Sequence, residues 1–568
     1  MTIVRTATAL RSLIVLASLL LPILTGCGGN QEIEQSNTFR YNEAEDLNSL
    51  DPARISARAS WWAGGQVHAG LVGLDPALKP MPLLARNWST SSDGRVWTFT
   101  LRSDARFADD PCFPDGKGRR IVAEDVRYSF ERICNPATAS TGFWVFHGKV
   151  AGADEFFKDP AKTGHVAGFR ALNDSTFELT LAEPSPLVLS LLAMPYCYVV
   201  PHEGVQKYGS DFFRHPVGAG AFKVAEWVNG QRLVLVRNGN YFERDAQGKQ
   251  LPYLDSVVVS FIRDKKTEFA EFESGRLDMA GSIDATMLDK VFTRKGDSVT
   301  LTPEFASCTM YRSPSMSVNY YGFQLDPSAP GAAGSPFVTN PMLRRALNYA
   351  IDREALVHYV MRDQAIPASA GPVPPGVPGY AGVKGYDFDR DLALRLLDSA
   401  GYPNGKGLPV IVLQVSEVER VVAVAQAVQE QFKAIGITVK INQVSPAQHR
   451  QMVAEGKLPF WSANWMADYP DAENFIALFY SRYKAPSGSN TTRFADARVD
   501  SLYLAALAPG LGTEQRAAIY GQAEAIILRE APWLLLFHTT VTRLTRPGVK
   551  GYSVDPLDRL TLAVVRKS

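Results

Sequence analysis

The sequence predicts an α/β fold with more than one domain, and three observations indicate it. Short β-rich segments dominate up to about residue 265, whereas strand and helix patterns alternate in the second half. The chain of 568 residues exceeds what one hydrophobic core usually supports, so two or three domains are expected. No short internal repeat is visible, which favours separate domains over a repeat array.

Residues 1–26 are predicted to be a lipoprotein signal peptide. Two arginines precede an apolar run over residues 13–24, which has the length of a signal-peptide core and is too short to span a bilayer. Small residues then precede Cys27, as in a bacterial lipobox, where cleavage leaves the cysteine as a lipid-modified N-terminus. A plain secretory signal with an incidental cysteine is the alternative. We expect export, with residues 27–36 as lipid anchor and tether, and Gly28 favours the outer membrane.

Acidic and basic residues nearly balance. The chain has 59 Lys and Arg against 58 Asp and Glu, and residues 1–26 remove two Arg and no acid, which leaves 57 against 58. A nucleic-acid partner would require a basic surface, so this class of function is excluded. Strong attraction to anionic lipid is not expected either.

The remaining cysteines lie in a compartment that permits disulfides. Cys112 and Cys134 bracket a Gly/Pro/Asp-rich loop and a helix, so a disulfide between them is predicted, with free buried thiols as the alternative. Free thiols are expected for Cys197 and Cys308. The chain shows no C-x-x-C, no G-x-S-x-G, no H-E-x-x-H and no His pair at metal-ligand spacing. We therefore expect no metal, no cofactor and no enzymatic activity.

In the first half, four segments are predicted strands. Apolar and polar residues alternate in 96–102 and 175–183, as in half-buried strands. The apolar residues are more continuous in 232–238 and 256–262, which predicts burial on both faces. The glycines of 218–223 lack the Lys-Ser/Thr ending of a phosphate loop and predict a turn before a strand.

In the second half, helices and strands alternate. A helix is predicted over residues 340–360, with Asn340 as its N-cap and a proline at its first position. Its apolar stripe at helical spacing is expected to consist of Met342, Ala346, Ala350 and Leu356 or Val357. Strands at 408–416 and 437–445 flank a helix over 417–436, which a glycine can end. This order predicts a right-handed parallel crossover, whose strand ends would face a ligand crevice.

Eight segments follow one another in unbroken order along the chain: NSLDPARI, GLVGLDPALKPMPLLARNWSTSSDGRVWTFTLRSDARF, AEDVRYSFERICNP, HPVGAGAFKVAEWVNGQRLVLVRNGNYF, GRLDMAG, LRRALNYAIDREALV, WMADYPDAENF and GYSVDPLDRLTL. Together they resemble the extracellular solute-binding proteins of the oligopeptide/dipeptide ABC importers, and the likeness extends from about residue 37 to 566. Each segment alone is a weak signal, whereas the ordered set is specific.

This resemblance implies a two-lobed, periplasmic-binding-protein-like fold of type II with an extra subdomain and a hinge. It also implies a monomer that captures peptides and delivers them to a membrane permease served by separate ATPase subunits. The expected boundaries are 37–59, 185–306 and 534–568 for the discontinuous lobe I, 60–184 for its subdomain, and 307–533 for lobe II.

The resemblance also implies the binding residues. Asp468 occupies the W-x-A-D-Y position whose Asp pairs with the peptide α-ammonium, and Trp465 and Tyr469 would exclude solvent. The alternative is that Asp468 caps the helix near Ala472, although Asp471 is better placed for that role. Added-strand contacts with the peptide main chain are expected from Ser56, Ala57 and Arg58, from Asn464, Trp465 and Met466, and Tyr241 is a further candidate.

One departure from the family bears on the cargo. The positions that match the carboxylate-binding cations of oligopeptide-binding relatives hold Met361, Glu419 and Ser462. Either Arg58 or Arg420 replaces them, or the cargo has no carboxylate at that distance. A nickel chelate, an opine or an oligosaccharide is therefore an alternative cargo. An envelope hydrolase or a chaperone-like scaffold is an alternative of a different class.

Overall fold

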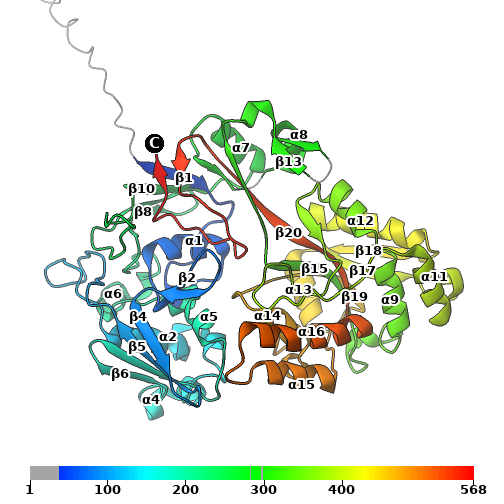
Figure 1. Ribbon diagram of the computed structural model, residues 1–568, viewed down its shortest axis with the longest axis horizontal. Helices are drawn as coiled ribbons and strands as arrows, with labels where there is room; N and C mark the ends of the chain where they lie inside the picture. Colours follow the sequence, from blue (N-terminus) through cyan, green and yellow to red (C-terminus); the bar gives the residue numbers. More distant parts are fainter. Residues whose placement is uncertain (1–36, 282, 296–297) are drawn as a thin grey trace, which may run out of the picture.

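The computed structural model describes residues 37–281, 283–295 and 298–568. Figure 1 shows two bodies side by side, with the C-terminal strand β20 between them. We call them the N-terminal body, built on the sheets that contain β1 and β4, and the C-terminal body, built on an eight-stranded sheet. The signal peptide, Cys27 and the tether lie outside the described residues and stay predictions.

Two four-stranded sheets form the N-terminal body. In the first, β1 runs parallel to β10 and the other pairs are antiparallel: β1 (Thr38–Asn42), β10 (Ser256–Ser260), β9 (Arg232–Arg237) and β8 (Phe222–Val228). The second is antiparallel throughout: β4 (Ala85–Thr90), β5 (Val96–Leu101), β7 (Thr176–Thr180) and β6 (Phe169–Asn173). All four predicted strands of this half are therefore confirmed.

One expectation about these strands is wrong. β9 and β10 alternate buried and more exposed residues, so they are not buried on both faces. The reason is that only one face of their sheet packs on the core, through Leu233, Leu235, Val257 and Val259. The predicted turn before β8 is confirmed, and its glycine at 220 allows close approach, since a Cβ there would lie 2.4 Å from the Gln66 carbonyl oxygen.

Helices and two small strand pairs complete the N-terminal body. The helices are α1 (Arg58–Val67), α2 (Ala123–Cys134), α3 (Ala153–Lys158), α4 (Pro160–Thr163), α5 (Val188–Leu192) and α6 (His202–Tyr208). The pairs are β2 (Val72–Leu74) with β3 (Pro80–Pro82), and β21 (Val549–Lys550) with β22 (Arg566–Lys567). Together they enclose one large hydrophobic core, which the chain's C-terminal tail joins through Leu562 and Val565.

The predicted disulfide is not formed. Cys112 and Cys134 are both free cysteines, as are Cys197 and Cys308. Cys134 ends α2, whereas Arg119 of the loop pairs with Asp125 in the first turn of that helix, 2.6 Å away. The loop therefore sits at the start of α2, and a helix of 12 residues is about 18 Å long, too far for a bridge.

The C-terminal body contains the predicted crossover. Its sheet has the order β11 (Met279–Ala280), β20 (Trp533–Thr545), β15 (Ser317–Phe323), β19 (Phe460–Met466), β17 (Ile411–Ser416) and β18 (Val439–Val444), and β14 (Thr309–Pro314) and β16 (Ala365–Pro367) also pair with β20. β17 and β18 are parallel, as predicted, and α12 (Glu419–Lys433) connects them. Gly436 follows α12 with a φ of 81°, the conformation expected of the residue that ends it.

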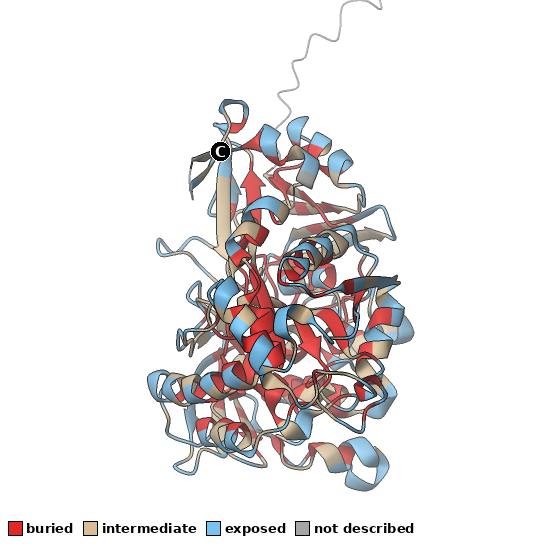
Figure 2. Ribbon diagram, turned by 90° about the vertical axis from the view of Figure 1, so that its right-hand side faces the viewer, coloured by how far each residue is buried: buried red, intermediate tan, exposed pale blue. Residues whose placement is uncertain are grey.

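The remaining helices of this body cover both faces of its sheet and enclose two cores. They are α9 (Pro341–Tyr349), α10 (Arg353–Ala355), a π-helix (Leu356–Val360), α11 (Arg390–Ser399), α13 (Pro446–Ala454), α14 (Glu473–Ile476), α15 (Ala497–Ala506) and α16 (Thr513–Glu530). Figure 2 shows the buried residues on the inner strands and the exposed ones on the outer helix faces.

The helix predicted over residues 340–360 is confirmed only in its first half. Asn340 caps α9 by accepting a hydrogen bond from the Leu343 N–H at 3.0 Å. The helix breaks after Tyr349 because Asp352 caps a new segment by accepting from the Ala355 N–H at 2.9 Å. The buried face of α9 is formed by Leu343, Ala346 and Leu347, not by the predicted Met342, which is 41% exposed.

β20 links the bodies. Its first residues pair with β15, and its last two pair with β11 at Met279 and Ala280. Next to its end, α7 (Lys265–Glu273), α8 (Leu288–Val291), β12 (Phe292–Lys295) and β13 (Ser298–Leu301) form a small separate core with Leu544. The expected boundary between residues 533 and 534 falls at the start of this strand.

Neither a membrane span nor a metal cluster is found in the part of the chain that the structure describes. None of its helices combines the length and hydropathy that crossing a bilayer needs. No group of three or more His, Cys, Asp or Glu side chains in these residues could hold a metal ion.

Candidate ligand-binding site

The end of β19 has one free edge. On one side, β15 pairs with β19 along its whole length, from Phe323 with Phe460 to Ser317 with Met466. On the other side, the register joins β17 to β19 only between Gln414 and Trp461. Within the described part of the chain, residues 463–466 therefore have a strand partner on one side only, and an extended chain could pair with the other side.

Asp468 follows this edge directly. The Ala467 N–H donates to the Met316 carbonyl at 2.8 Å and ends the pairing, and the Asp468 N–H turns inward to the Asn474 Oδ1 at 3.2 Å. The Trp465 Nε1–H donates to the same oxygen at 2.9 Å. Among the described residues, no cation forms an ion pair with the half-buried Asp468 carboxylate.

Burial sets the charge state of this carboxylate. Loss of hydration raises the pKa of Asp468 from 3.8 to about 6, a hydrogen bond with the Asn474 side chain opposes the rise, and the nearby Glu473 adds to it. The group is therefore ionised at neutral pH and poorly hydrated, and no described residue supplies a counter-ion. A cationic group of a ligand would supply the missing counter-ion and a charge-assisted hydrogen bond.

Aromatic side chains of the N-terminal body face this region. Trp144 stacks on Tyr469, with ring centroids 6.4 Å apart and planes at 28°. Tyr196 meets Trp144 edge-on at 6.2 Å, and the charge of Asp468 helps to raise the pKa of the Tyr196 hydroxyl, after burial as the main cause. In Figure 1, α14, which follows Asp468, lies on the side of the C-terminal body that faces α5. The environment of Asp468 thus combines residues from both bodies.

A buried polar cluster lies behind Tyr469. Asp471 is paired with Arg516 through two hydrogen bonds of 2.7 Å, and its Oδ1 accepts from the Glu473 N–H at 2.9 Å. Glu473 in turn accepts from the Tyr469 hydroxyl and, at 2.5 Å, from the Tyr503 hydroxyl. Asp471 therefore supports the turn that leads into α14, whose N-cap position is Ala472 and has no side-chain cap, so the expectation that Asp471 caps the helix is wrong. The alternative that Asp468 caps it is also wrong, because among the described residues the Asp468 side chain accepts from no main-chain N–H of this helix.

Lys149 of the N-terminal body faces the same cluster. Its Nζ donates to the Trp144 carbonyl at 2.9 Å. Burial lowers the pKa of Lys149, and the charges of Glu473 and Asp154 oppose that change. The contact between the bodies next to Asp468 is thus partly electrostatic.

The second predicted strand-binding segment lies in the N-terminal body. Ser56 is exposed, Ala57 is the N-cap of α1, and Arg58 begins that helix. Arg58 forms ion pairs with Glu43 at 2.9 Å and with Asp558 at 3.8 Å. Among the described residues, no hydrogen bond or ion pair connects this segment with β19.

Tyr241 is not brought to Asp468. It is 7% exposed, packs on Phe242 with ring centroids 5.1 Å apart, and donates from its hydroxyl to Glu243 at 2.5 Å. It belongs to the core of the N-terminal body, so nothing in its contacts supports a role at the site.

The positions that match the family's carboxylate-binding cations remain without a cation. Met361 and Ser462 are buried at 4% and 8% exposure, and Glu419 is exposed in the first turn of α12. Of the two expected replacements, Arg58 already has acidic partners, whereas Arg420 is exposed and makes no ion pair with any described residue. Arg420 is therefore the freer cation.

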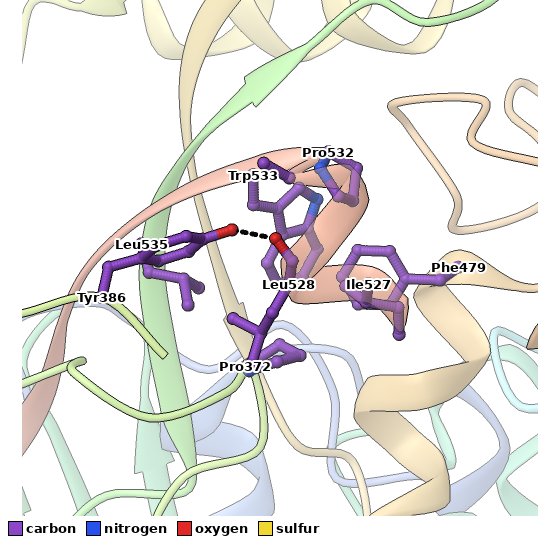
Figure 3. A pocket seen from close by; sticks show the side chains of 9 residues that line it. Pro372, Tyr386, Phe479, Ile527, Leu528, Pro532, Trp533 and Leu535 are labelled. Atoms are coloured by element: carbon purple, nitrogen blue, oxygen red, sulfur yellow. Dashed lines mark hydrogen bonds between the residues drawn. The ribbon is translucent and has the colours of Figure 1, made fainter. Parts of the chain in front are cut away.

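Two cavities are separate from this site. Figure 3 shows a void of about 10 Å³ in the C-terminal body, lined by apolar side chains such as Phe479 and Trp533 and closed by a hydrogen bond from the Tyr386 hydroxyl to the Leu528 carbonyl. It is large enough for about one water molecule. A groove of about 700 Å³ adjoins β14, β16 and the π-helix, and contains none of the predicted binding residues.

The structure adds residues that sequence reasoning did not identify. Tyr196 and Lys149 reach the site through contacts between distant segments, and no local pattern marks them. Asn474 lies in the same quoted segment as Asp468, but its role follows from hydrogen bonds that only the folded turn forms. Trp144 lies in an aromatic-rich run whose composition is also typical of a core. Its contact with Tyr469 depends on how the two bodies meet.

Comparisons with known proteins agree with this architecture. A family model described as "Bacterial extracellular solute-binding proteins, family 5 Middle" matches residues 79–487. The periplasmic oligopeptide-binding protein OppA of Escherichia coli (strain K12) is 27% identical over 538 residues, covering 93% of this chain and 92% of OppA. The glutathione-binding protein GsiB of Salmonella typhimurium is 26% identical over 518 residues, covering 90% of this chain and 91% of GsiB.

A solved structure shows the same fold. The unliganded open form of the periplasmic murein tripeptide-binding protein MppA superposes with a TM-score of 0.75 at 24% identity, covering 94% of this chain and 98% of MppA. The predicted two-lobed α/β fold is thereby confirmed. Since the family model matches more than half of the chain, the protein belongs to the bacterial extracellular solute-binding proteins of family 5.

Proposed function

We propose that this protein captures peptides by their charged amino end and delivers them to the permease of an ABC importer. One observation carries the proposal: Asp468 is a poorly hydrated carboxylate without a cationic partner among the described residues, beside a free strand edge. A peptide could supply both missing partners, an ammonium group for Asp468 and a main chain for β19. The relatives OppA, an oligopeptide-binding protein, and GsiB, a glutathione-binding protein, support this class of cargo.

Binding is proposed to occur between the two bodies. Asn464, Trp465 and Met466 would pair with the cargo main chain from one side, and Ser56, Ala57 and Arg58 from the other. Main-chain hydrogen bonds do not read side chains, so many sequences would be accepted. Arg420 is the freer of the two cations that could receive the cargo carboxylate.

The cellular arrangement is proposed from the N-terminal sequence. The mature chain would be held at the membrane by a lipid on Cys27, and separate cytoplasmic subunits would hydrolyse ATP. Mass spectrometry of the mature N-terminus should find a diacylglyceryl group on Cys27. Release of a Cys27→Ser variant from the membrane would support the anchor, and an unmodified Cys27 would contradict it.

The cargo proposal is tested with Asp468→Asn and calorimetric titration of trialanine and N-acetyl-trialanine. Loss of a charge-assisted hydrogen bond should weaken trialanine binding roughly 10- to 100-fold. Acetylation should weaken binding to the unmodified protein comparably, because it removes the same charge. Glu524→Gln is the matched control, because Glu524 is another buried carboxylate without a cationic partner among the described residues, and its side chain accepts from the Val373 N–H.

The outcomes separate the alternatives. Trialanine binding that is unchanged in Asp468→Asn would contradict ammonium recognition. Binding of a nickel chelate, an opine or an oligosaccharide in place of peptides would assign a different cargo to the same fold. Cleavage products after incubation with peptides would indicate a hydrolase.

A further inference from the structure

We propose that Asn474 is the positioning residue of the site, whose buried amide holds the Asp468 main chain and the Trp465 ring in place and so presents the Asp468 carboxylate to the cargo. The inference rests on the proposed function and adds a residue to it. Asn474 is 5% exposed and lies in the short helix α14, six positions after Asp468.

A single oxygen atom of Asn474 joins two parts of the site. Its Oδ1 accepts from the Trp465 Nε1–H at 2.9 Å and from the Asp468 N–H at 3.2 Å. A carbonyl oxygen has two lone pairs, and both are used. The last residues of β19 and the turn that carries the carboxylate are therefore fixed relative to each other by one buried side chain.

These contacts also determine how the amide is oriented. An indole N–H and a main-chain N–H can only donate, so the atom that faces them must be the oxygen. The amide NH₂ is then the part of the side chain that is left to act on acceptors, and the Asn474 side chain lowers the pKa of the Asp468 carboxyl and of the Tyr469 hydroxyl, against the effect of burial. The neighbour of Asp468 is thus a neutral donor group and not a cation.

The charged and titratable groups around Asp468 give this donor a function. Glu473 of α14 repels the Asp468 charge, and Tyr196 of the N-terminal body faces it. Lys149 interacts with Glu473 and Asp154, not with Asp468. Because no cation of the described part of the chain offsets the repulsion, the Asn474 side chain helps to keep Asp468 ionised while no ligand is bound.

Two substitutions separate the two roles of the amide. Asn474→Asp keeps an acceptor for Trp465 and for the Asp468 N–H, but it replaces the donor by a second carboxylate. Asn474→Leu has a similar volume and removes acceptor and donor together. Asn490→Leu is the matched control, because Asn490 is also fully buried in the same body and bonds to the Tyr480 and Phe494 carbonyls, away from Asp468.

The experiment is calorimetric titration of the purified protein with trialanine and N-acetyl-trialanine between pH 5 and 8, together with the melting temperature of each variant. Asn474→Leu should weaken trialanine binding roughly tenfold at pH 8 and reduce its advantage over the acetylated peptide. Asn474→Asp should shift the pH at which half of the affinity is lost upward by roughly one unit. Asn490→Leu should lower the melting temperature and leave both this pH and the advantage of trialanine unchanged.

The experiment distinguishes failure of the proposed function from failure of the positioning role of Asn474. If the unmodified protein does not bind trialanine, or Asp468→Asn binds it equally well, the proposed function fails. If Asp468→Asn loses binding but both Asn474 variants keep the pH dependence and the trialanine advantage of the unmodified protein, only the positioning role fails. Should Asn474→Leu not fold, Asn474→Asp decides alone through its pH dependence.

Discussion

Two aspartates three positions apart, Asp468 and Asp471, have opposite surroundings. Asp471 is 7% exposed and is paired with Arg516 through two hydrogen bonds of 2.7 Å. Asp468 is half-buried and has no ion-pair partner among the described residues. The same side chain thus stabilises the turn at one position and leaves a charge for a ligand at the other.

The difference comes from the elements that pack on each residue. Arg516 lies in α16, and also donates to the Tyr520 hydroxyl at 2.9 Å, so the partner of Asp471 is itself held in place. Asp468 instead faces Tyr196 and a strand edge without a neighbour. Rigid support next to an unsatisfied carboxylate is what a preorganised binding site requires.

The largest effect on stability is expected from breaking the ion pair between Asp471 and Arg516. Arg516→Leu leaves the buried Asp471 charge without its partner and should lower the free energy of unfolding by about 3–5 kcal/mol. Arg498→Leu is the control, because Arg498 pairs with Asp496 while 56% exposed and should lose at most about 1 kcal/mol. Urea denaturation measures the free energy of unfolding of both variants. Equal losses would mean that the buried ion pair contributes no more to stability than the exposed one.

Cargo binding should be strongest between about pH 6 and pH 8. Asp468 takes up a proton as the pH falls through its pKa of about 6, which removes the charge that binds the ammonium. A peptide α-amino group loses its proton above about pH 8. Calorimetric titration of trialanine from pH 4.5 to 9 should give a bell-shaped affinity profile, and affinity that does not change between pH 7 and pH 5 would contradict the role of Asp468.

The smallest effect is a gain in stability without cargo. The pKa of Asp468 is raised in the folded protein, so its ionisation opposes folding increasingly as the pH rises from about 4 to about 6, and by a constant amount above. Asp468→Asn should therefore raise the free energy of unfolding by about 1–2 kcal/mol at pH 8 and change it little at pH 4. If the free energy of unfolding at pH 8 is the same in both proteins, burial does not make ionisation of Asp468 unfavourable for folding.

The predictable part of the fold follows from local patterns. The alternation of apolar and polar residues predicted β5 and β7. The β17–α12–β18 crossover was predicted from two strand patterns, the helix pattern between them and the glycine that ends the helix. The break after Tyr349 was not predicted because the apolar spacing continues through it, whereas Asp352 starts a new helical segment there.

The site was predictable only in part, for a similar reason. A motif shared with a family marked Asp468 and its aromatic neighbours. Tyr241 carried the same kind of signal, yet it packs in the core of the N-terminal body. The predicted disulfide between Cys112 and Cys134 was wrong because the spacing of the cysteines along the chain does not show at which end of α2 the loop lies.

By itself, the sequence determined the α/β class and the carboxylate at position 468, and it predicted an export signal, since each of these depends on residues close together in the chain. Only the tertiary structure decided that Asp471 is paired with Arg516, whereas the Asp468 main chain is held by Asn474 and its carboxylate has no cationic partner in the described part of the chain. The physical reason is that a charge acts through its surroundings in space: hydration, hydrogen-bond donors and counter-ions come from segments that meet only when the chain is folded.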